Sequence, residues 1–325
     1  MFKKPVVRNT LKTILALSIL LYLFSKVDLK TFSSIARTIK PGYISLALII
    51  SFCSMFLSSY KWHLLLRSRN VRINYINSTK AYFVGNFFNS FLPGTVGGDV
   101  VKIYRLRDTT DKFEDIFSTT LMDRFIGFVA SLVMIIFAAV LNLGIFESNN
   151  NLLFVILILS TVTLLFLLLL FNKPLFKKLD FIYKPAFKLL KFMNLEEKCA
   201  RLYNSTHNFR HQIPVLAANF GLSLAVKVLY VVLSYFVGLS VNLGVDLYYF
   251  FVFVPLVGCL SLIPVSFNGL GVREGISYLF YTRAGAEIEN ILIYSLLTYL
   301  VALVISILGG VVYVYEELTD KKERT

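Results

Sequence analysis

Charged residues are scarce in this chain of 325 residues. They make up 16% of the sequence, whereas 57% of the residues are hydrophobic and the mean hydropathy is +0.71. Soluble proteins contain about 25% charged and about 45–50% apolar residues. This composition excludes a soluble globular domain and predicts an all-α polytopic membrane protein.

Cysteine is also rare. Cys53, Cys199 and Cys259 lie far apart and form no C-x-x-C pair, which excludes a disulfide framework and a zinc site. His207 and His211 have the i, i+4 spacing of metal ligands, but no Glu accompanies them in their basic stretch. We therefore expect surface histidines and no bound metal.

Signatures of nucleotide binding and catalysis are missing as well. The stretch Gly94–Asp99 lacks the Gly-Lys-Ser/Thr ending of a nucleotide loop, and the glycines of Gly269–Gly275 have the wrong spacing for a dinucleotide fold. The sequence offers no nucleophile with a plausible base and no pair of carboxylates outside the apolar runs. We expect neither enzyme activity nor a cofactor.

Basic residues outnumber acidic residues, 33 to 19, and give a net charge of +14. They cluster between apolar runs, where the positive-inside rule for cytoplasmic loops explains them, so we expect no nucleic-acid partner. The apolar run 13–24 follows four basic residues and precedes no cleavage site, which predicts an uncleaved first helix with a cytoplasmic N-terminus. Residues 1–42 combine this helix with a basic amphipathic segment whose side of the membrane stays open.

Long apolar runs predict five further spans, at 43–66, 124–146, 151–171, 214–239 and 291–315, and six in total. Lys61, near an aromatic end of the first of these, is expected to extend its amine to the membrane interface. Residues 147–151 carry no base and are predicted to be external. Residues 173–212 hold nine Lys or Arg against three acids, which indicates amphipathic helices on the cytoplasmic leaflet or an ordinary linker. Residues 316–325 form a charged cytoplasmic tail.

Two apolar segments, 81–107 and 248–281, are interrupted by Gly and Pro. In each, an aliphatic residue and a Pro precede a polar Gly-rich turn, and an acid then starts a new helix. Paired interrupted segments in two halves are typical of transporter binding sites. We predict two opposed re-entrant hairpins in an inverted repeat. Repeat A is 43–146 and repeat B is 214–315, joined by 147–213, and the hairpin tips are expected to meet near the bilayer midplane.

Asp99 and Glu274 each follow glycines at the expected start of a half-helix. An acid there offsets the positive end of the helix dipole by about 0.3–1 kcal/mol, so capping alone accounts for both residues. Ionisable groups at membrane depth are, however, functional by default, and both explanations stay open. Lys102 and Arg273 are the expected partners of the two acids, and Lys227, in the middle of a span, can reach either hairpin.

Three motifs resemble one family. They are Leu92-Pro-Gly-x-x-Gly-Gly-Asp99-x-x-Lys102, Asp123-Arg124-x-x-Gly127 and Pro264-x-Ser-x-Asn268-Gly-x-Gly-x-Arg273-Glu274. Together they are similar to the flippase-like integral membrane family typified by the transmembrane half of lysylphosphatidylglycerol synthase. Lys102 departs from the family's more frequent Arg, which keeps the charge but not a bidentate grip on phosphate. The candidate lipid or anion site comprises Asn89, Pro93, Gly97, Gly98, Asp99, Lys102, Arg105, Asp123, Arg124, Lys227, Pro264, Asn268, Gly269, Gly271, Arg273 and Glu274.

The resemblance implies movement of an anionic, aminoacylated or polyprenyl-linked lipid between the leaflets of the cell membrane, without a nucleotide motor. We expect the aminoacyltransferase domain of the synthase to be absent. The alternative is a membrane partner that presents a lipid substrate to a separate glycosyltransferase or synthase without moving it. Membrane lipids are the expected partners in both cases, and the oligomeric state stays open.

The predicted topology can be tested with reporter fusions. A reporter active only outside the membrane should be active when fused at Asn149, which no base surrounds, and silent at Lys188, within the basic segment. Activity at Lys188, or the same result at both positions, contradicts the inverted repeat.

Overall fold

The computed structural model describes residues 30, 34–35, 37–91, 97–107, 113–141, 154, 156–161, 163, 196–261 and 271–324, and these ranges contain helices and no strand. The all-α prediction is therefore confirmed for this part of the chain. The helices are α3 (Pro41–Ser68), α4 (Tyr75–Phe91), α5 (Gly97–Arg107), α6 (Phe113–Leu141), α11 (Glu196–His207), η1 (Asn208–His211), α12 (Ile213–Ser240), α13 (Leu247–Leu260), α14 (Val272–Tyr281) and α15 (Ile288–Arg324).

Four of these helices, α3, α6, α12 and α15, are long and apolar enough to cross a membrane. They correspond to four of the six predicted spans. The predicted helix at 13–24 and most of the span at 151–171 lie outside the described residues. The start predicted for α6 was wrong, because the helix begins at Phe113 and not at Arg124. Glu114 and Asp115 in its first turn favour this start, since acids stabilise a helix N-terminus.

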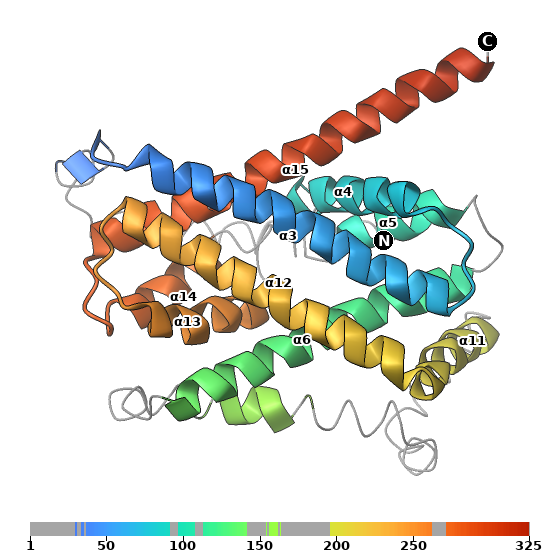
Figure 1. The fold of residues 1–325 in the computed structure, drawn as a ribbon, viewed down its shortest axis with the longest axis horizontal. Helices are drawn as coiled ribbons and strands as arrows, with labels where there is room; N and C mark the ends of the chain where they lie inside the picture. The colour runs from blue at the N-terminus through green and yellow to red at the C-terminus, as the bar shows by residue number, and fades with distance from the viewer. Residues whose placement is uncertain are drawn as a thin grey trace, which may run out of the picture.

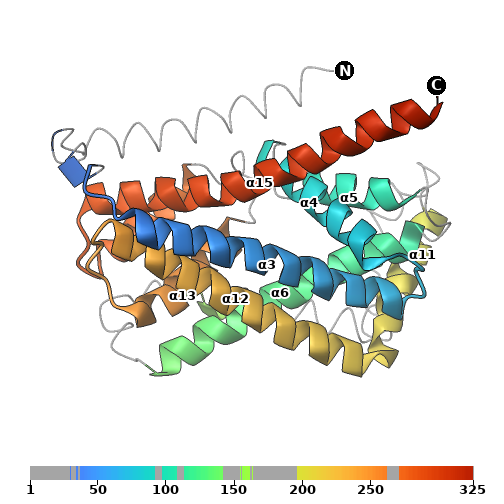
Figure 2. The ribbon, with the colours of Figure 1, turned by 45° about the horizontal axis from the view of Figure 1, so that its top comes forward.

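The two interrupted segments form short helices. The helices α4 and α5 contain 17 and 11 residues, and α13 and α14 contain 14 and 10. At 1.5 Å per residue their lengths are about 25, 16, 21 and 15 Å, all shorter than a hydrocarbon core of about 30 Å. The α4–α5 pair and the α13–α14 pair lie at opposite ends of the long helices (Figures 1 and 2). The predicted hairpin tips are 93–99 and 264–274; of these, 93–96 and 264–270 lie outside the described residues, and the meeting of the tips stays a prediction.

The long helices α3 and α12 run side by side at the centre (Figure 1). Small residues at three- or four-residue spacing, Ala47, Ser51, Ser54 and Ser58, are buried along α3. Such residues let membrane helices approach closely, because they leave the backbones little side-chain bulk to clear. Large apolar side chains face outward on α6 and α15, as expected for contact with lipid: Val133, Ile136, Phe137, Val140, Leu300, Val304, Ile307 and Val311.

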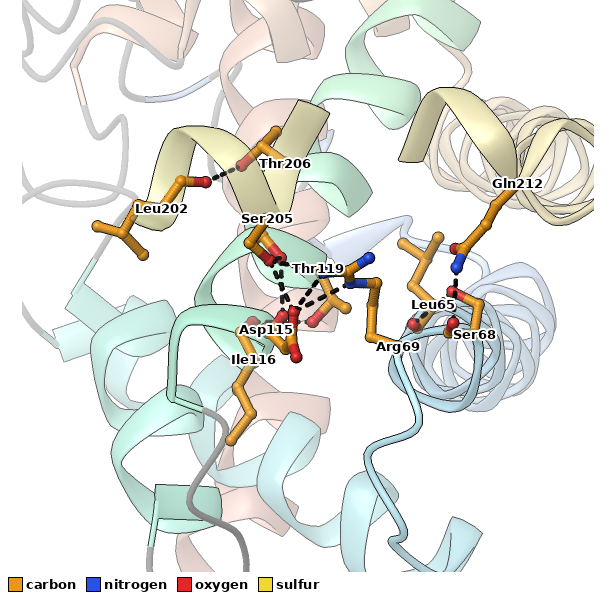
Figure 3. A network of polar contacts seen from close by, with 11 residues as sticks. Leu65, Ser68, Arg69, Asp115, Ile116, Thr119, Leu202, Ser205, Thr206 and Gln212 are labelled. Atoms are coloured by element: carbon orange, nitrogen blue, oxygen red, sulfur yellow. Dashed lines mark hydrogen bonds and ion pairs between the residues drawn. The ribbon is translucent and has the colours of Figure 1, made fainter. Parts of the chain in front are cut away.

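A polar network fastens α11 to the end of the bundle where α3 finishes (Figure 3). The Arg69 guanidinium donates to Asp115 Oδ1 at 2.6 Å, and Ser205 Oγ of α11 donates to the same oxygen at 2.7 Å. Gln212 Nε2 donates to the Ser68 carbonyl at 2.7 Å. Because α11 packs here, His207 is fully buried, and the prediction of a surface histidine was wrong for this residue; His211 is exposed.

Candidate functional site

The first hairpin is closed by contacts between the end of α4 and the start of α5. The Gly98 backbone N–H donates to Asn89 Oδ1 at 2.8 Å, so a side chain of α4 caps the N-terminus of α5. A Cβ on Gly98 would lie only 1.8 Å from the Gly85 carbonyl oxygen. Glycine is therefore required at Gly98, because the two helices approach too closely there for any side chain.

Asp99, in the first turn of α5, is the centre of a buried charged cluster. Its carboxylate lies 3.4 Å from Lys102 Nζ and forms an ion pair with the Arg124 guanidinium of α6. The Lys102 ammonium also lies 4.3 Å from the ring centroid of Trp62 and 4.7 Å from that of Tyr82. The predicted pairing of Lys102 with Asp99 is confirmed. Aromatic faces add a second source of stabilisation for this cation.

A second buried ion pair completes the cluster. Lys61 Nζ of α3 donates to Asp123 Oδ1 of α6 at 2.7 Å, and both residues are buried. The expectation that Lys61 extends to the interface was wrong, because Asp123 offers the ammonium a charged partner inside the bundle. Asn219 Nδ2 of α12 donates to the Lys61 carbonyl at 2.7 Å and joins the central helix to the same turn.

The cluster contains more positive than negative charge. Lys227 of α12 interacts electrostatically with Lys61 and Asp123. Among the described acids, none forms an ion pair with Lys227, so it is not the structural partner of Asp99 or Glu274. Three cations, Lys61, Lys102 and Arg124, thus gather around the two carboxylates of Asp99 and Asp123, and Lys227 lies at the next level of the bundle. An excess of cations in a largely buried cluster favours an anionic ligand.

The second hairpin starts its helix α14 with a different cap. Glu274 Oε2 accepts the Gly271 backbone N–H at 2.6 Å, and Ser295 Oγ of α15 lies 3.4 Å from the other carboxylate oxygen. Gly271 has a φ of 81°, a left-handed conformation that glycine adopts without a steric penalty. Glu274 is fully buried and acts as a cap. The predicted pairing of Glu274 with Arg273 was wrong, since no ion pair joins these two described side chains.

Arg273 instead lines a cavity of about 230 Å³. Its guanidinium lies 5.6 Å from the Tyr299 ring centroid. Arg273 Nε and Ser261 Oγ are both buried without a hydrogen-bond partner among the described residues, and both residues border this cavity. Other hydroxyl groups border it: those of Ser51, Tyr230, Ser234, Ser277, Tyr281, Tyr294, Ser295 and Thr298.

The cluster and the cavity lie at different levels of the bundle. On α12, Asn219 marks the level of the cluster and Ser234 that of the cavity. Lys227 is about 12 Å along the helix from Asn219 and about 10 Å from Ser234, at 1.5 Å per residue. Tyr230 interacts electrostatically with both Tyr82 and Arg273. Lys227 and Tyr230, one turn apart, therefore connect the two polar regions.

The structure brings together most of the predicted residues of the first hairpin and separates one. Arg105 forms an ion pair with Glu316 of α15, which Lys80 Nζ also contacts at 3.2 Å, and it does not join the cluster. Gly97 begins α5. Pro93, Pro264, Asn268 and Gly269 lie outside the described residues.

Sequence reasoning missed several residues: Lys61 as a buried cation, Trp62, Tyr82, Tyr230 and the serines of α3. The position of Lys61 in the sequence could have indicated its burial, because a residue seven positions before the end of a helix lies about 10 Å from that end along the helix axis. The described residues contain no group of three or more His, Cys, Asp or Glu side chains arranged to hold a metal ion.

Comparison with known families gives one match. The family model described as "Lysylphosphatidylglycerol synthase TM region" matches residues 9–310, which is nearly the whole chain. No curated protein sequence matches the chain.

The glycine contact in the first hairpin predicts a sharp difference between two substitutions. Gly98→Ala places a Cβ 1.8 Å from the Gly85 carbonyl oxygen and 2.6 Å from Asn89 Cγ, so the hairpin must separate and folded protein should be lost. Gly221→Ala is the matched control, because a Cβ there meets nothing within 4 Å and a helical Gly→Ala change gains about 0.5–1 kcal/mol. Size-exclusion profiles and melting temperatures in detergent measure both. Equal behaviour of the two variants contradicts the close approach.

The Lys61–Asp123 pair predicts that two changes together cost less than one. Asp123→Ala leaves the Lys61 ammonium buried and unpaired, which should destabilise the protein by about 3–5 kcal/mol. The double variant Lys61→Met with Asp123→Leu removes both charges and should recover most of the loss, as seen by thermal melting. An Asp123→Ala protein that melts like the original shows that the pair is not buried as described.

Proposed function

The chain belongs to the family of the lysylphosphatidylglycerol synthase TM region, a membrane domain tied to lipid handling, and we propose that it moves a phosphate-bearing lipid between leaflets. In this proposal the protein catalyses no covalent step and uses no nucleotide. The candidate substrates are anionic, aminoacylated or polyprenyl-linked lipids. The observation that carries the proposal is the series of buried and partly buried cations at successive levels of the bundle.

A headgroup that crosses the hydrocarbon core must replace its hydration with protein contacts. A charged group at the bilayer centre costs several kcal/mol unless it is paired. The cluster around Asp99 and the cavity beside Arg273 each offer positive charge, and Lys227 lies between their levels. The start of α5 adds backbone N–H groups and the positive end of a helix dipole, which suit a phosphate. A phosphate therefore meets compensating charge at each step of its path.

A pattern of helix contacts that fits the proposed inverted repeat is the second support for transport. Exchange of α3, α4, α5 and α6 with α12, α13, α14 and α15 turns each major helix contact into another observed contact. The α4 helix packs on α15, and α13 packs on α6, so the first arm of each short pair contacts the last long helix of the other half. Two short pairs at opposite ends fit opposed re-entrant hairpins. Such repeats place the substrate site at their interface.

The proposed topology places the Ser68 end of the bundle in the cytoplasm, together with both chain termini. Arg67, Arg69 and Arg72 follow one another at this end, as the positive-inside rule requires. The cluster then lies in the cytoplasmic half of the membrane and the Arg273 cavity in the outer half.

Transport by purified protein in liposomes tests the proposal. A fluorescent analogue of phosphatidylglycerol, bleached from outside, should lose more than half of its signal when the protein is present, because lipid from the inner leaflet becomes accessible. Lys227→Ala should lower the rate at least about tenfold, the effect of one lost charge-assisted hydrogen bond. Its abundance should be maintained, because no ion pair with a described acid is broken.

The matched control is Arg72→Ala, which removes the same charge from an exposed loop and should transport normally. Trp62 gives a separate binding signal, because it is the one tryptophan of the chain and contacts the Lys102 ammonium. Lipid-dependent Trp62 fluorescence without transport would support the alternative function, a partner that presents lipid to a separate enzyme. If neither transport nor a lipid-dependent change in Trp62 fluorescence is observed, both candidate functions are contradicted.

A further inference from the structure

The Arg273 cavity combines one cation with many hydroxyl groups. Among the described residues that border it, Arg273 is the single charged one and nine Ser, Thr and Tyr residues carry hydroxyls, some of which already bond within the protein, as Tyr281 does with Tyr294. Two polar atoms at its edge, Arg273 Nε and Ser261 Oγ, are buried without a described partner. Unsatisfied buried donors of this kind cost free energy unless a ligand or water meets them. The chemistry that fits them is an anionic oxygen beside further hydroxyl groups.

Among the described residues, the acids of the cluster and of α14 are all engaged by cations or by backbone groups. The Asp99 carboxylate is paired with Lys102 and Arg124, and the Asp123 carboxylate with Lys61. Glu274 is fully buried and caps Gly271 while it also contacts Ser295. Asp99 and Glu274 are the acids of the two predicted hairpin tips, and the sequence between the paired short helices, 92–96 and 262–270, contains no further Asp or Glu. An ammonium would therefore meet Arg273 or Lys227 without a compensating carboxylate.

Resting on the lipid transport proposed above, we propose that the substrate is an anionic lipid with a phosphodiester and a hydroxylated headgroup, and that aminoacylated lipids are excluded. The phosphodiester binds the Arg273 guanidinium, and headgroup hydroxyls bond with the cavity's serines and tyrosines. Phosphoglycerol lipids and polyprenyl phosphosugars share this chemistry. In this proposal the protein discriminates against the aminoacylated lipid after which the family is named.

Binding measured without transport tests this selectivity. The full chain in detergent is titrated with phosphatidylglycerol, a polyprenyl phosphosugar, phosphatidic acid and lysyl-phosphatidylglycerol, and affinity is followed by native mass spectrometry. The first or second lipid should bind tightest, and which of them does so identifies the source. Phosphatidic acid lacks headgroup hydroxyls and should bind about fivefold weaker for each hydrogen bond lost. Lysyl-phosphatidylglycerol should bind on the order of a hundredfold weaker, because its ammonium groups face like charge.

Two variants separate charge from hydroxyl recognition. Arg273→Glu should invert the order, so that lysyl-phosphatidylglycerol binds better than phosphatidylglycerol; an acid in the first turn of α14 also suits the helix dipole, so folding is retained. Ser277→Ala should weaken phosphatidylglycerol but not phosphatidic acid. Ser45→Ala, whose hydroxyl bonds to Pro41 in the same helix, is the matched control.

The outcomes distinguish this inference from the proposed function. Equal binding of lysyl-phosphatidylglycerol and phosphatidylglycerol, or an Arg273→Glu variant with an unchanged order, overturns the selectivity whether or not lipid moves in liposomes. Equal binding of phosphatidic acid overturns the role of the hydroxyl groups. Selective binding with no movement in liposomes supports the selectivity and rejects translocation.

Discussion

The arrangement of the bundle depends on the ion pairing of Asp99 and Asp123. A buried carboxylate is tolerated inside a membrane protein only when cations and donors surround it. Asp99 of α5 needs Arg124 of α6 and Lys102, while Asp123 of α6 needs Lys61 of α3. These requirements place the short helix α5 against two long helices. The apolar side chains of Trp62, Ile103 and Ile116 pack together within the arrangement of helices that these ion pairs allow.

The close approach of α4 and α5 follows from the same requirement. The helix that delivers Asp99 to α6 packs beside its own incoming arm α4, and at about 16 Å it is shorter than a hydrocarbon core of about 30 Å. Gly85 and Gly98 allow that return, since side chains at either position would collide with the other helix. In the second hairpin Glu274 caps its own helix and leaves Arg273 for the cavity. The two hairpins share a pattern of glycine and acid but use the acid differently.

Much of the framework could be predicted from hydropathy alone. Four long helices appear where spans were predicted, apart from the start of α6 and the end of α15, which continues to Arg324 through the predicted tail, and Asp99 lies in the first turn of a helix as its place after Gly97 and Gly98 indicated. Apolar length and glycine position are local properties, which a sequence displays directly. The partners of the charges are not local. Lys61 and Asp123 are 62 residues apart, and no pattern in either segment indicates the other. Arg105 was wrongly included in the predicted site for the same reason. It lies one turn beyond Lys102 but pairs with Glu316 of α15.

The strength of the ion pairs differs between the middle and the end of the bundle. At the Ser68 end, Glu316 pairs with Lys80 and Arg105, and these side chains remain 20–40% exposed. Exposed pairs of this kind contribute about 0–1 kcal/mol each, whereas breaking a buried pair costs about 3–5 kcal/mol.

A proposed movement of the first hairpin relative to α15 would break the weak pairs at Glu316 and the packing of α4 on α15, where Ser306 Oγ donates to Ser90 Oγ at 2.8 Å. The Asp99 and Asp123 pairs join α5, α6 and α3 of the first proposed repeat, which could then travel as a unit. Lys227 belongs to the other repeat and has no ion pair with a described acid to restrain it. Lys227 can therefore change its neighbours if the two proposed repeats move relative to each other.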